Sequence, residues 1–183
     1  MHPMTARQRG YTLVEVLVTV TILGIMGVMV IPSLSQTGIL KTHAAVRTVI
    51  SDLTYAQSDA LAYQEGRAIL FDVDTNSYTL IGVTGSTIDP ATDALFNTRG
   101  PNQRYVVSLD DPRYGGAHFE NIDFNNGSLL VFDEMGGPVA APSSTDLSTG
   151  GTVDIVGGDG TRYRLTISAF TGRIRVGQIN VGG

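Results

Sequence analysis

The chain has 183 residues, no cysteine, a hydrophobic fraction of 42% and a formal net charge of −5. This length and composition predict one globular domain that can bury a core, together with an apolar anchor. The absence of cysteine excludes disulfide bonds and any metal site built from thiolates.

An apolar run extends from Tyr11 to Leu34 and contains a single acidic or basic side chain, that of Glu15. At about 1.5 Å per residue, a helix of this length can cross a hydrocarbon layer of roughly 30 Å. An ionised acid in such a helix costs about 3 kcal/mol at the bilayer centre and less near the end. We therefore expect a transmembrane helix over residues 11–34, in which Glu15 is a functional residue that needs a partner.

A short basic leader ends at Gly10, and Thr12 and Glu15 follow as the second and fifth residues of the apolar run. This pattern resembles the prepilin-peptidase signal of type IV pilins and type II secretion pseudopilins, and it is carried by Gly10, Thr12, Glu15, Gly24 and Pro32. The resemblance implies that residues 1–10 are a leader, that the Gly10–Tyr11 bond is cut and that Tyr11 is N-methylated. The usual first residue in that family is Phe, so Tyr11 is a mild departure.

The resemblance also implies that Glu15 pairs with the terminal amine of a neighbouring subunit in a filament. Physical chemistry agrees, because a buried acid and a buried ammonium satisfy each other and set register more than they add stability. Gly24, Gly27 and Pro32 weaken the helix, so that it can bend while it packs. The alternative is an ordinary signal anchor with an incidental acid. A cleavable secretory signal is disfavoured by the length of the run.

The leader carries Arg7 and Arg9, which favour keeping that end inside the cell. Cleavage would leave 10 Lys/Arg against 17 Asp/Glu, a formal charge of −7. Lys41 and Arg47 lie beyond the other end of the span, and their positive charges weaken the argument that Arg7 and Arg9 set the orientation of the helix. The resemblance implies a single-pass protein of the inner membrane with its carboxy-terminal domain in the periplasm.

Beyond Pro32, residues 35–66 are predicted to continue the helix on the periplasmic side, ending near Gly66 as a cap. Apolar residues recur at steps of three and four on one face: Val46, Val49, Ile50, Leu53, Ala56, Ala60 and Leu61. Asp52, Gln57 and Asp59 are predicted on other faces. The stretch from Ala56 to Ala60 is similar to a pattern common in H-type pseudopilins and FimT-like minor pilins.

Residues 67–183 have the shorter period of β-strands. The predicted strands are Ala68–Val73, Tyr78–Val83, Tyr105–Leu109, Ile122–Phe124, Ser128–Asp133, Thr152–Val156, Tyr163–Ser168 and Thr171–Val176. The first two of these strands are predicted to form an antiparallel hairpin, as are Thr152–Val156 and Tyr163–Ser168. Residues 84–104 are predicted as a long surface loop with room for one short strand. A helix followed by many short antiparallel strands predicts an α+β fold. The resemblance, which includes a Phe-Asp-x-x-Gly segment at Phe132, implies a GspH/FimT-like domain with two small sheets packed on the helix.

No catalytic motif is found in the chain, so we expect neither an enzyme nor a cofactor. His118 is interpreted as a surface histidine, and no spaced histidine pair predicts a zinc site. Asp133 and Glu134 are adjacent and would point to opposite faces of a strand, which makes them a poor acid–base pair. Asp110 and Asp111 match no EF-hand spacing and are interpreted as a solvated turn rather than a calcium site.

Arg162 and Arg164 are two residues apart, as are Arg173 and Arg175, so each pair projects from one face of a predicted strand. If the strands are neighbours, four guanidinium groups form a basic patch on an acidic protein. Gly172–Arg175 matches a Gly-Arg-x-Arg element through which some FimT-like minor pilins take part in DNA uptake. The alternative is a solvated hairpin face or pairing with acids, and four contacts predict only weak, salt-sensitive DNA binding.

Together, the resemblance implies a minor pseudopilin similar to the H protein of type II secretion. Its partners would be other pseudopilins or pilins, a prepilin peptidase and inner-membrane lipid. One alternative is a FimT-like minor pilin of a type IV pilus that contacts DNA. Another is a membrane-anchored enzyme or binding protein, which the missing site motifs disfavour.

Overall fold

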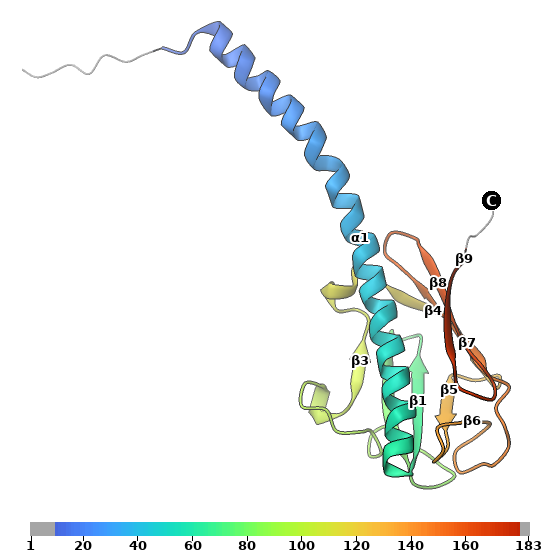
Figure 1. The fold of residues 1–183 in the computed structure, drawn as a ribbon. Coiled ribbons are helices and arrows are strands. Elements are labelled where there is room, and N and C mark those ends of the chain that lie inside the picture. The colour runs from blue at the N-terminus through green and yellow to red at the C-terminus, as the bar shows by residue number, and fades with distance from the viewer. Residues whose placement is uncertain (1–9, 180–183) are drawn as a thin grey trace, which may run out of the picture. The chain divides into compact units, whose positions relative to one another are not determined.

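The structure, a computed structural model, describes residues 10–179, apart from the side chains of residues 28–37. The chain forms two compact units, which meet in sequence between Thr37 and Gly38. Helix α1 runs from Leu13 to Tyr63, and all strands of the described chain follow it (Figure 1). The strands are β1 Gly66–Asp72, β2 Ser77–Val83, β3 Val106–Ser108, β4 His118–Phe124, β5 Leu129–Phe132, β6 Pro138–Val139, β7 Gly151–Val156, β8 Arg162–Ile167 and β9 Ile174–Ile179.

The strands form two antiparallel sheets, a five-stranded sheet of order β3-β2-β1-β5-β6 and a four-stranded sheet of order β4-β7-β8-β9. β1 and β2 form the predicted hairpin, in which Asp72 pairs with Ser77 and Gly66 with Val83. β7 and β8 form the second predicted hairpin, with Val156 opposite Arg162. The α+β class and the two small sheets are therefore confirmed.

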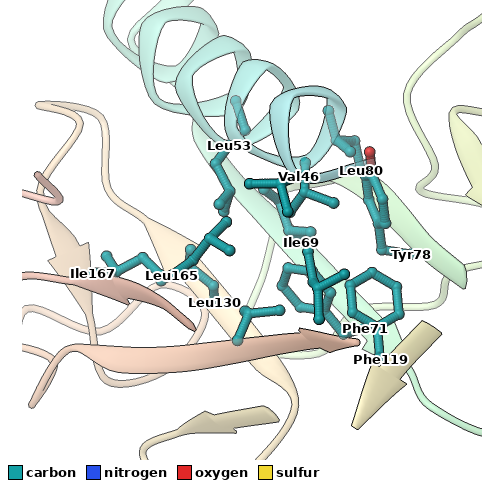
Figure 2. Close-up of a cluster of buried hydrophobic side chains, with 14 of the residues drawn as sticks. Val46, Leu53, Ile69, Phe71, Tyr78, Leu80, Phe119, Leu130, Leu165 and Ile167 are labelled. Atoms are coloured by element: carbon teal, nitrogen blue, oxygen red, sulfur yellow. The ribbon is translucent and has the colours of Figure 1, made fainter. Parts of the chain in front are cut away.

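The core lies between the second half of α1 and the two sheets. Val46 and Leu53 of α1 point toward Ile69 of β1 and Leu165 of β8, and the aromatic side chains of Phe71, Tyr78 and Phe119 gather beside them (Figure 2). Fully burying an aliphatic side chain contributes about 1.5–3 kcal/mol, so this face of α1 accounts for much of the attachment of the helix. Five of the seven apolar helix positions predicted to face the core are buried: Val46, Val49, Leu53, Ala56 and Ala60.

The burial predicted from the helix periodicity was wrong at three positions. Leu61 is 53% exposed, whereas Asp52 and Asp59 are only 7% and 9% exposed. Both carboxylates are buried because the sheets supply hydrogen-bond donors to them. The spacing of apolar residues within the helix cannot predict such donors, because the donors belong to residues outside the helix.

Element boundaries also differ from the predictions at several points. The helix ends at Tyr63, Gln64 follows in the left-handed conformation at φ 55°, and Gly66 is the first residue of β1 rather than the cap. A side chain at Gly66 would lie 3.0 Å from Cβ of Val83, so the glycine serves the close pairing of two strands. The last strand begins at Ile174 because residues 168–173 form a turn, in which Gly172 has a φ of 62°. β4 begins at His118, four residues before the predicted strand.

The predicted loop over residues 84–104 covers part of the outer face of the five-stranded sheet. Its Ile88 packs against a second apolar cluster formed by Ala68, Ile81, Val131 and Val139. Single bridges join Ile81 to Ala94 and Phe96 to Arg104. The loop therefore buries the side of the sheet that faces away from α1.

Candidate processing and assembly site

Thr12 caps the amino terminus of α1. Its backbone carbonyl accepts from the N–H of Glu15 at 3.0 Å, and its Oγ1 lies 3.3 Å from the same nitrogen. Thr12 and Glu15 have the spacing of a capping box, and a carboxylate in the first helical turn also complements the helix dipole. The sequence reasoning used Thr12 only as part of a motif, although this spacing could have identified it as the helix cap.

Glu15 lies in the first turn of α1 and is exposed. No ion pair joins it to another described residue. Gly10 and Tyr11 precede the helix in exposed chain without regular secondary structure, where a peptidase could reach the bond between them. The structure thus places the three predicted residues within one short segment. A carboxylate without a partner in its own chain is available to a cation from another molecule.

Apart from Glu15, Thr19 and Thr21, the side chains from Leu13 to Met26 are apolar, and they are exposed on every side of α1. Large exposed ones are Leu13, Val14, Val16, Leu17, Val18, Val20, Ile22, Leu23, Ile25 and Met26. The hydroxyls of Thr19 and Thr21 donate to backbone carbonyls within the helix, at 2.9 and 2.7 Å. A helix that is apolar all round is stable only when lipid or other protein covers it.

The described residues contain no helix with an apolar window long enough to span a bilayer. The predicted span over residues 11–34 includes residues 28–34, whose side chains lie outside the described ones.

At the other end of α1, a buried ion pair joins the helix to β1. Nε of Arg67 lies 2.5 Å from Oδ2 of Asp59, and Nη1 of the same guanidinium reaches Oε2 of Glu65 at 3.0 Å. The guanidinium also lies over the ring of Tyr63, 5.7 Å from its centroid. These contacts with carboxylates raise the pKa of Arg67, against the effect of burial. Asp59 belongs to the family-like stretch Ala56–Ala60, but its partner was not predicted.

A second buried carboxylate joins the middle of α1 to two strands. Oδ2 of Asp52 accepts from the hydroxyl of Tyr78 at 2.5 Å, and Oδ1 accepts from that of Tyr105 at 3.0 Å. Burial raises the pKa of Asp52, although both hydroxyls act in the opposite direction. Burial and the nearby carboxylate raise the pKa of both tyrosines. The cluster fixes β2 and the start of β3 against the helix.

Gln57 joins two turns that are far apart in sequence. Its Nε2 donates to the carbonyl oxygens of Gly136, at 2.8 Å, and of Thr171, at 3.0 Å. The first turn belongs to the Phe-Asp-x-x-Gly segment, in which Gly136 has a φ of 71° and lies against Leu61. Gln57 was predicted on a face of the helix other than the apolar one and as part of a family-like stretch, but its two partners were not predicted, although it holds both turns to the helix.

Three of the four candidate arginines lie on the neighbouring strands β8 and β9 and Arg173 directly precedes β9, and two of the four have an acidic partner among the described residues. β8 pairs with β9, and Thr166 lies opposite Arg175. Arg164 forms a bidentate pair with Asp154, both bonds being 2.7 Å long, and Arg162 pairs with Glu120. Arg173 and Arg175 are exposed, and no ion pair joins either to a described residue.

The remaining candidate residues have local roles. His118 is exposed at the start of β4. Asp111 accepts from the backbone N–H of Arg113 at 2.8 Å, Asp110 accepts from the side chain of Asn76 at 2.7 Å, and Asp133 accepts from the N–H of Gly137 at 2.7 Å. Among the residues that the structure describes, no group of three or more His, Asp or Glu side chains is arranged to hold a metal ion.

Comparison with known proteins matches the amino-terminal segment to one family. Residues 5–31 match the family described as the prokaryotic N-terminal methylation motif. Two curated relatives are named type II secretion system core protein G. The chain is 28% identical to the Klebsiella pneumoniae protein over 141 residues, 76% of this chain and 91% of that protein. It is 26% identical to the Dickeya chrysanthemi protein over 144 residues, 78% of this chain and 86% of that protein.

Among solved structures, the chain is similar to the minor pseudopilin EpsH from the type 2 secretion system of Vibrio cholerae. The TM-score is 0.50 with 15% sequence identity, over 75% of this chain and 97% of that chain. At this identity the likeness concerns the fold. It agrees with the arrangement of one helix and two antiparallel sheets.

A methylation motif at the start of an apolar helix, followed by a helix-packed pair of antiparallel sheets, defines a type IV pilin-like protein. The chain is similar to proteins of that class, and within it to the pseudopilins of type II secretion.

Proposed function

We propose that this protein is an H-like minor pseudopilin of a type II secretion system. It would be anchored in the inner membrane by its first helix, with its domain in the periplasm. A prepilin peptidase would cut the Gly10–Tyr11 bond, and Tyr11 would then be methylated. The matched motif over residues 5–31 and the exposed position of this bond support the proposal.

The observation that carries the proposal is the environment of Glu15. It is the single carboxylate on a helix segment that is otherwise apolar on every exposed side. When such segments pack together, this carboxylate needs a buried cation, and the amine of a processed neighbouring chain provides one. The pair would set the register of one helix against the next.

The place of the chain among pseudopilins has two candidates. The two-sheet fold, similar to that of a minor pseudopilin, favours the H-like place. The two curated relatives named core protein G favour the second candidate, a repeating subunit of the filament. Counting copies of the chain per isolated filament separates them, since the second candidate requires many copies along its length.

Membership of a type IV pilus, with DNA contacts through the arginines, has less support. Two of the four arginines are already paired with Glu120 and Asp154. Retardation of DNA at low salt that is lost in R173A/R175A would favour this alternative. The absence of retardation would exclude it.

The proposal is tested by expressing the full chain with a prepilin peptidase and weighing the product. The expected product lacks residues 1–10 and carries one methyl group on Tyr11. A Gly10→Val variant serves as the uncleaved control. In cells with the complete secretion machinery, Glu15→Ala should be processed but should not enter filaments, whereas the exposed-acid control Asp146→Ala should enter them. An unprocessed wild-type chain would refute the proposal.

A further inference from the structure

The four-stranded sheet of β4, β7, β8 and β9 (Figure 1) has one face that does not belong to the core. Its inward side chains, such as that of Leu165, are buried in the cluster that includes α1. Side chains alternate between the two faces along a strand, and directly paired residues share a face. From Asn121 and Asp123 on β4 to Arg175 and Gly177 on β9, every outward position is therefore polar or glycine. Such a face suits a ligand that binds through polar groups.

One row of outward side chains crosses all four strands. Asp123 of β4 lies opposite Thr152 of β7. Thr152 lies opposite Thr166 of β8, which in turn lies opposite Arg175 of β9. Because neighbouring strands are about 4.8 Å apart, the row is about 14 Å long. We call these four residues the polar row.

The surface is hollowed at both ends of the polar row. A hollow of about 370 Å³ is lined by Asp123 and Thr152, and a hollow of about 490 Å³ is lined by Thr166 and Arg175. The two hollows adjoin where Thr152 pairs with Thr166. They form a shallow groove across the strands, with the length of a short oligosaccharide.

The two ends of the groove carry opposite charges. Asp123 and Arg175 are exposed, and no ion pair joins either to a described residue. Between them, Arg164 is held in place by Asp154, to which its Nε and Nη2 donate at 2.7 Å each. No hydrogen bond joins its Nη1 to a described residue. The groove therefore offers a cation at one end, hydroxyls and a fixed guanidinium in the middle, and a carboxylate at the other end.

Gly177 keeps the groove open beside Arg164. It lies opposite Arg164 and two residues after Arg175, on the same face. A glycine inside a strand often marks a bulge, a bend or a place where a ligand approaches closely. The pairing of β8 with β9 is regular at this position, which excludes a bulge, and an added Cβ would meet nothing within 4 Å. The glycine thus leaves room that no described part of the chain fills.

We propose that the polar row binds a glycan in which neutral and carboxylate-bearing sugars alternate. Arg175 pairs with a sugar carboxylate, in a charge-assisted contact. Thr152 and Thr166 exchange hydrogen bonds with sugar hydroxyls, because a hydroxyl both donates and accepts. Asp123 accepts from the hydroxyls of a neutral sugar. Alternation follows from the charges, since a second carboxylate at the Asp123 end would be repelled.

Two other classes of ligand fit this face less well. Peptides are usually recognised at a strand edge or in apolar pockets, whereas the outward face of this sheet presents polar side chains. Single-stranded nucleic acid binds along a positively charged groove with aromatic side chains for stacking. The polar row has no aromatic residue, and Asp123 would repel a phosphate. The inference goes beyond the proposed function and does not depend on it.

Calorimetric titration of the full chain in detergent tests the site. The probe is a tetrasaccharide of alternating N-acetylglucosamine and N-acetylmuramic acid, in which every second sugar carries a carboxylate. The expected result is saturable binding that Arg175→Ala weakens about tenfold, the loss of one hydrogen-bonded charge contact. The tetramer of N-acetylglucosamine, which has no carboxylate, should bind about tenfold more weakly to the wild type. Arg175→Ala should not weaken that binding further.

A steric variant tests the position of the site. Gly177→Leu places a side chain in the groove and should abolish binding of both saccharides. Gly85→Leu is the matched control, because an added Cβ there also meets nothing within 4 Å and the position lies outside the sheet. It should bind as the wild type does. Urea unfolding shows that both variants are folded.

Three results would overturn the inference. One is the absence of saturable binding of the acidic tetrasaccharide to the wild type. Another is binding that is unchanged in Arg175→Ala or in folded Gly177→Leu. The third is a single-stranded oligonucleotide that binds and is lost in Arg175→Ala while the saccharide does not bind, which would assign the groove to nucleic acid.

Discussion

The guanidinium of Arg67 and the carboxylate of Asp59 form a buried ion pair at the place where α1 ends and β1 begins. The side chains are 6% and 10% exposed, and the pair spans the left-handed residue Gln64. Because only two residues separate the helix from the strand, this contact sets the direction in which the chain enters the five-stranded sheet.

Replacing Arg67 by alanine should lower the free energy of unfolding by about 3–5 kcal/mol, because the carboxylate of Asp59 would stay buried without a partner. The matched control is Arg162→Ala, which removes a half-exposed pair with Glu120 and should cost no more than about 1 kcal/mol. Urea unfolding followed by far-ultraviolet circular dichroism measures both. Equal losses in the two variants would contradict a special role for the buried pair.

Asp52 predicts a pH dependence of stability with a definite sign. Burial raises its pKa above the ordinary value of 3.8, so the folded state holds this proton more tightly than the unfolded state. The stability contributed by the protonated form is therefore complete below pH 3.8 and is lost as the pH rises through the folded pKa.

The measurement compares Asp52→Asn with the wild type above pH 3.8. The amide oxygen still accepts from one of the two tyrosine hydroxyls, and the amide NH2 can donate to the oxygen of the other. Because the amide does not ionise, the variant should gain stability relative to the wild type as the pH rises. Asp74→Asn, which changes an exposed carboxylate, serves as control and should track the wild type. A constant difference between Asp52→Asn and the wild type across the pH range would refute the assignment.

Gly136 and Gly160 offer a matched pair for separating backbone strain from packing. Both have positive φ values, 71° and 81°, so alanine is strained at either. At Gly136 an added Cβ would lie 2.9 Å from Cγ of Leu61, whereas at Gly160 nothing lies within 4 Å. Gly136→Ala should therefore cost about 1–3 kcal/mol more than Gly160→Ala in urea unfolding, the range typical of overpacking. A smaller loss at Gly136 than at Gly160 would show that the turn moves freely from the helix.

Single substitutions of Thr12 and Glu15 should have different effects on the incorporation of the chain into filaments. Thr12→Ala removes a helix cap, which costs about 1 kcal/mol in the first turn, and should only reduce the yield of filaments. Glu15→Gln keeps the size of the side chain but removes the charge, and should abolish incorporation while the domain unfolds at the same urea concentration as the wild type. Immunoblots of sheared filaments measure incorporation. Filaments that contain Glu15→Gln at wild-type levels would contradict pairing with an amine.

Local patterns in the sequence determined much of the fold. The periodicity of Val46, Val49 and Leu53 indicated the buried face of α1, and alternation with turn residues located both hairpins. These signals are readable because they depend on neighbours within a few residues. The motif that includes Gly10–Glu15 was recognised for the same reason, since its residues lie within one short stretch of chain. The cut after Gly10 and the role of Glu15 stay predictions.

Interactions between distant segments were decided only by the tertiary structure. Asp52 and Asp59 looked like solvent-facing acids until Tyr78, Tyr105 and Arg67 were brought to them by strands that follow the helix. The four arginines looked equivalent until Asp154 and Glu120 neutralised two of them. The energy of a buried or exposed charge depends on which groups surround it in space, and spacing along a chain carries no record of those groups.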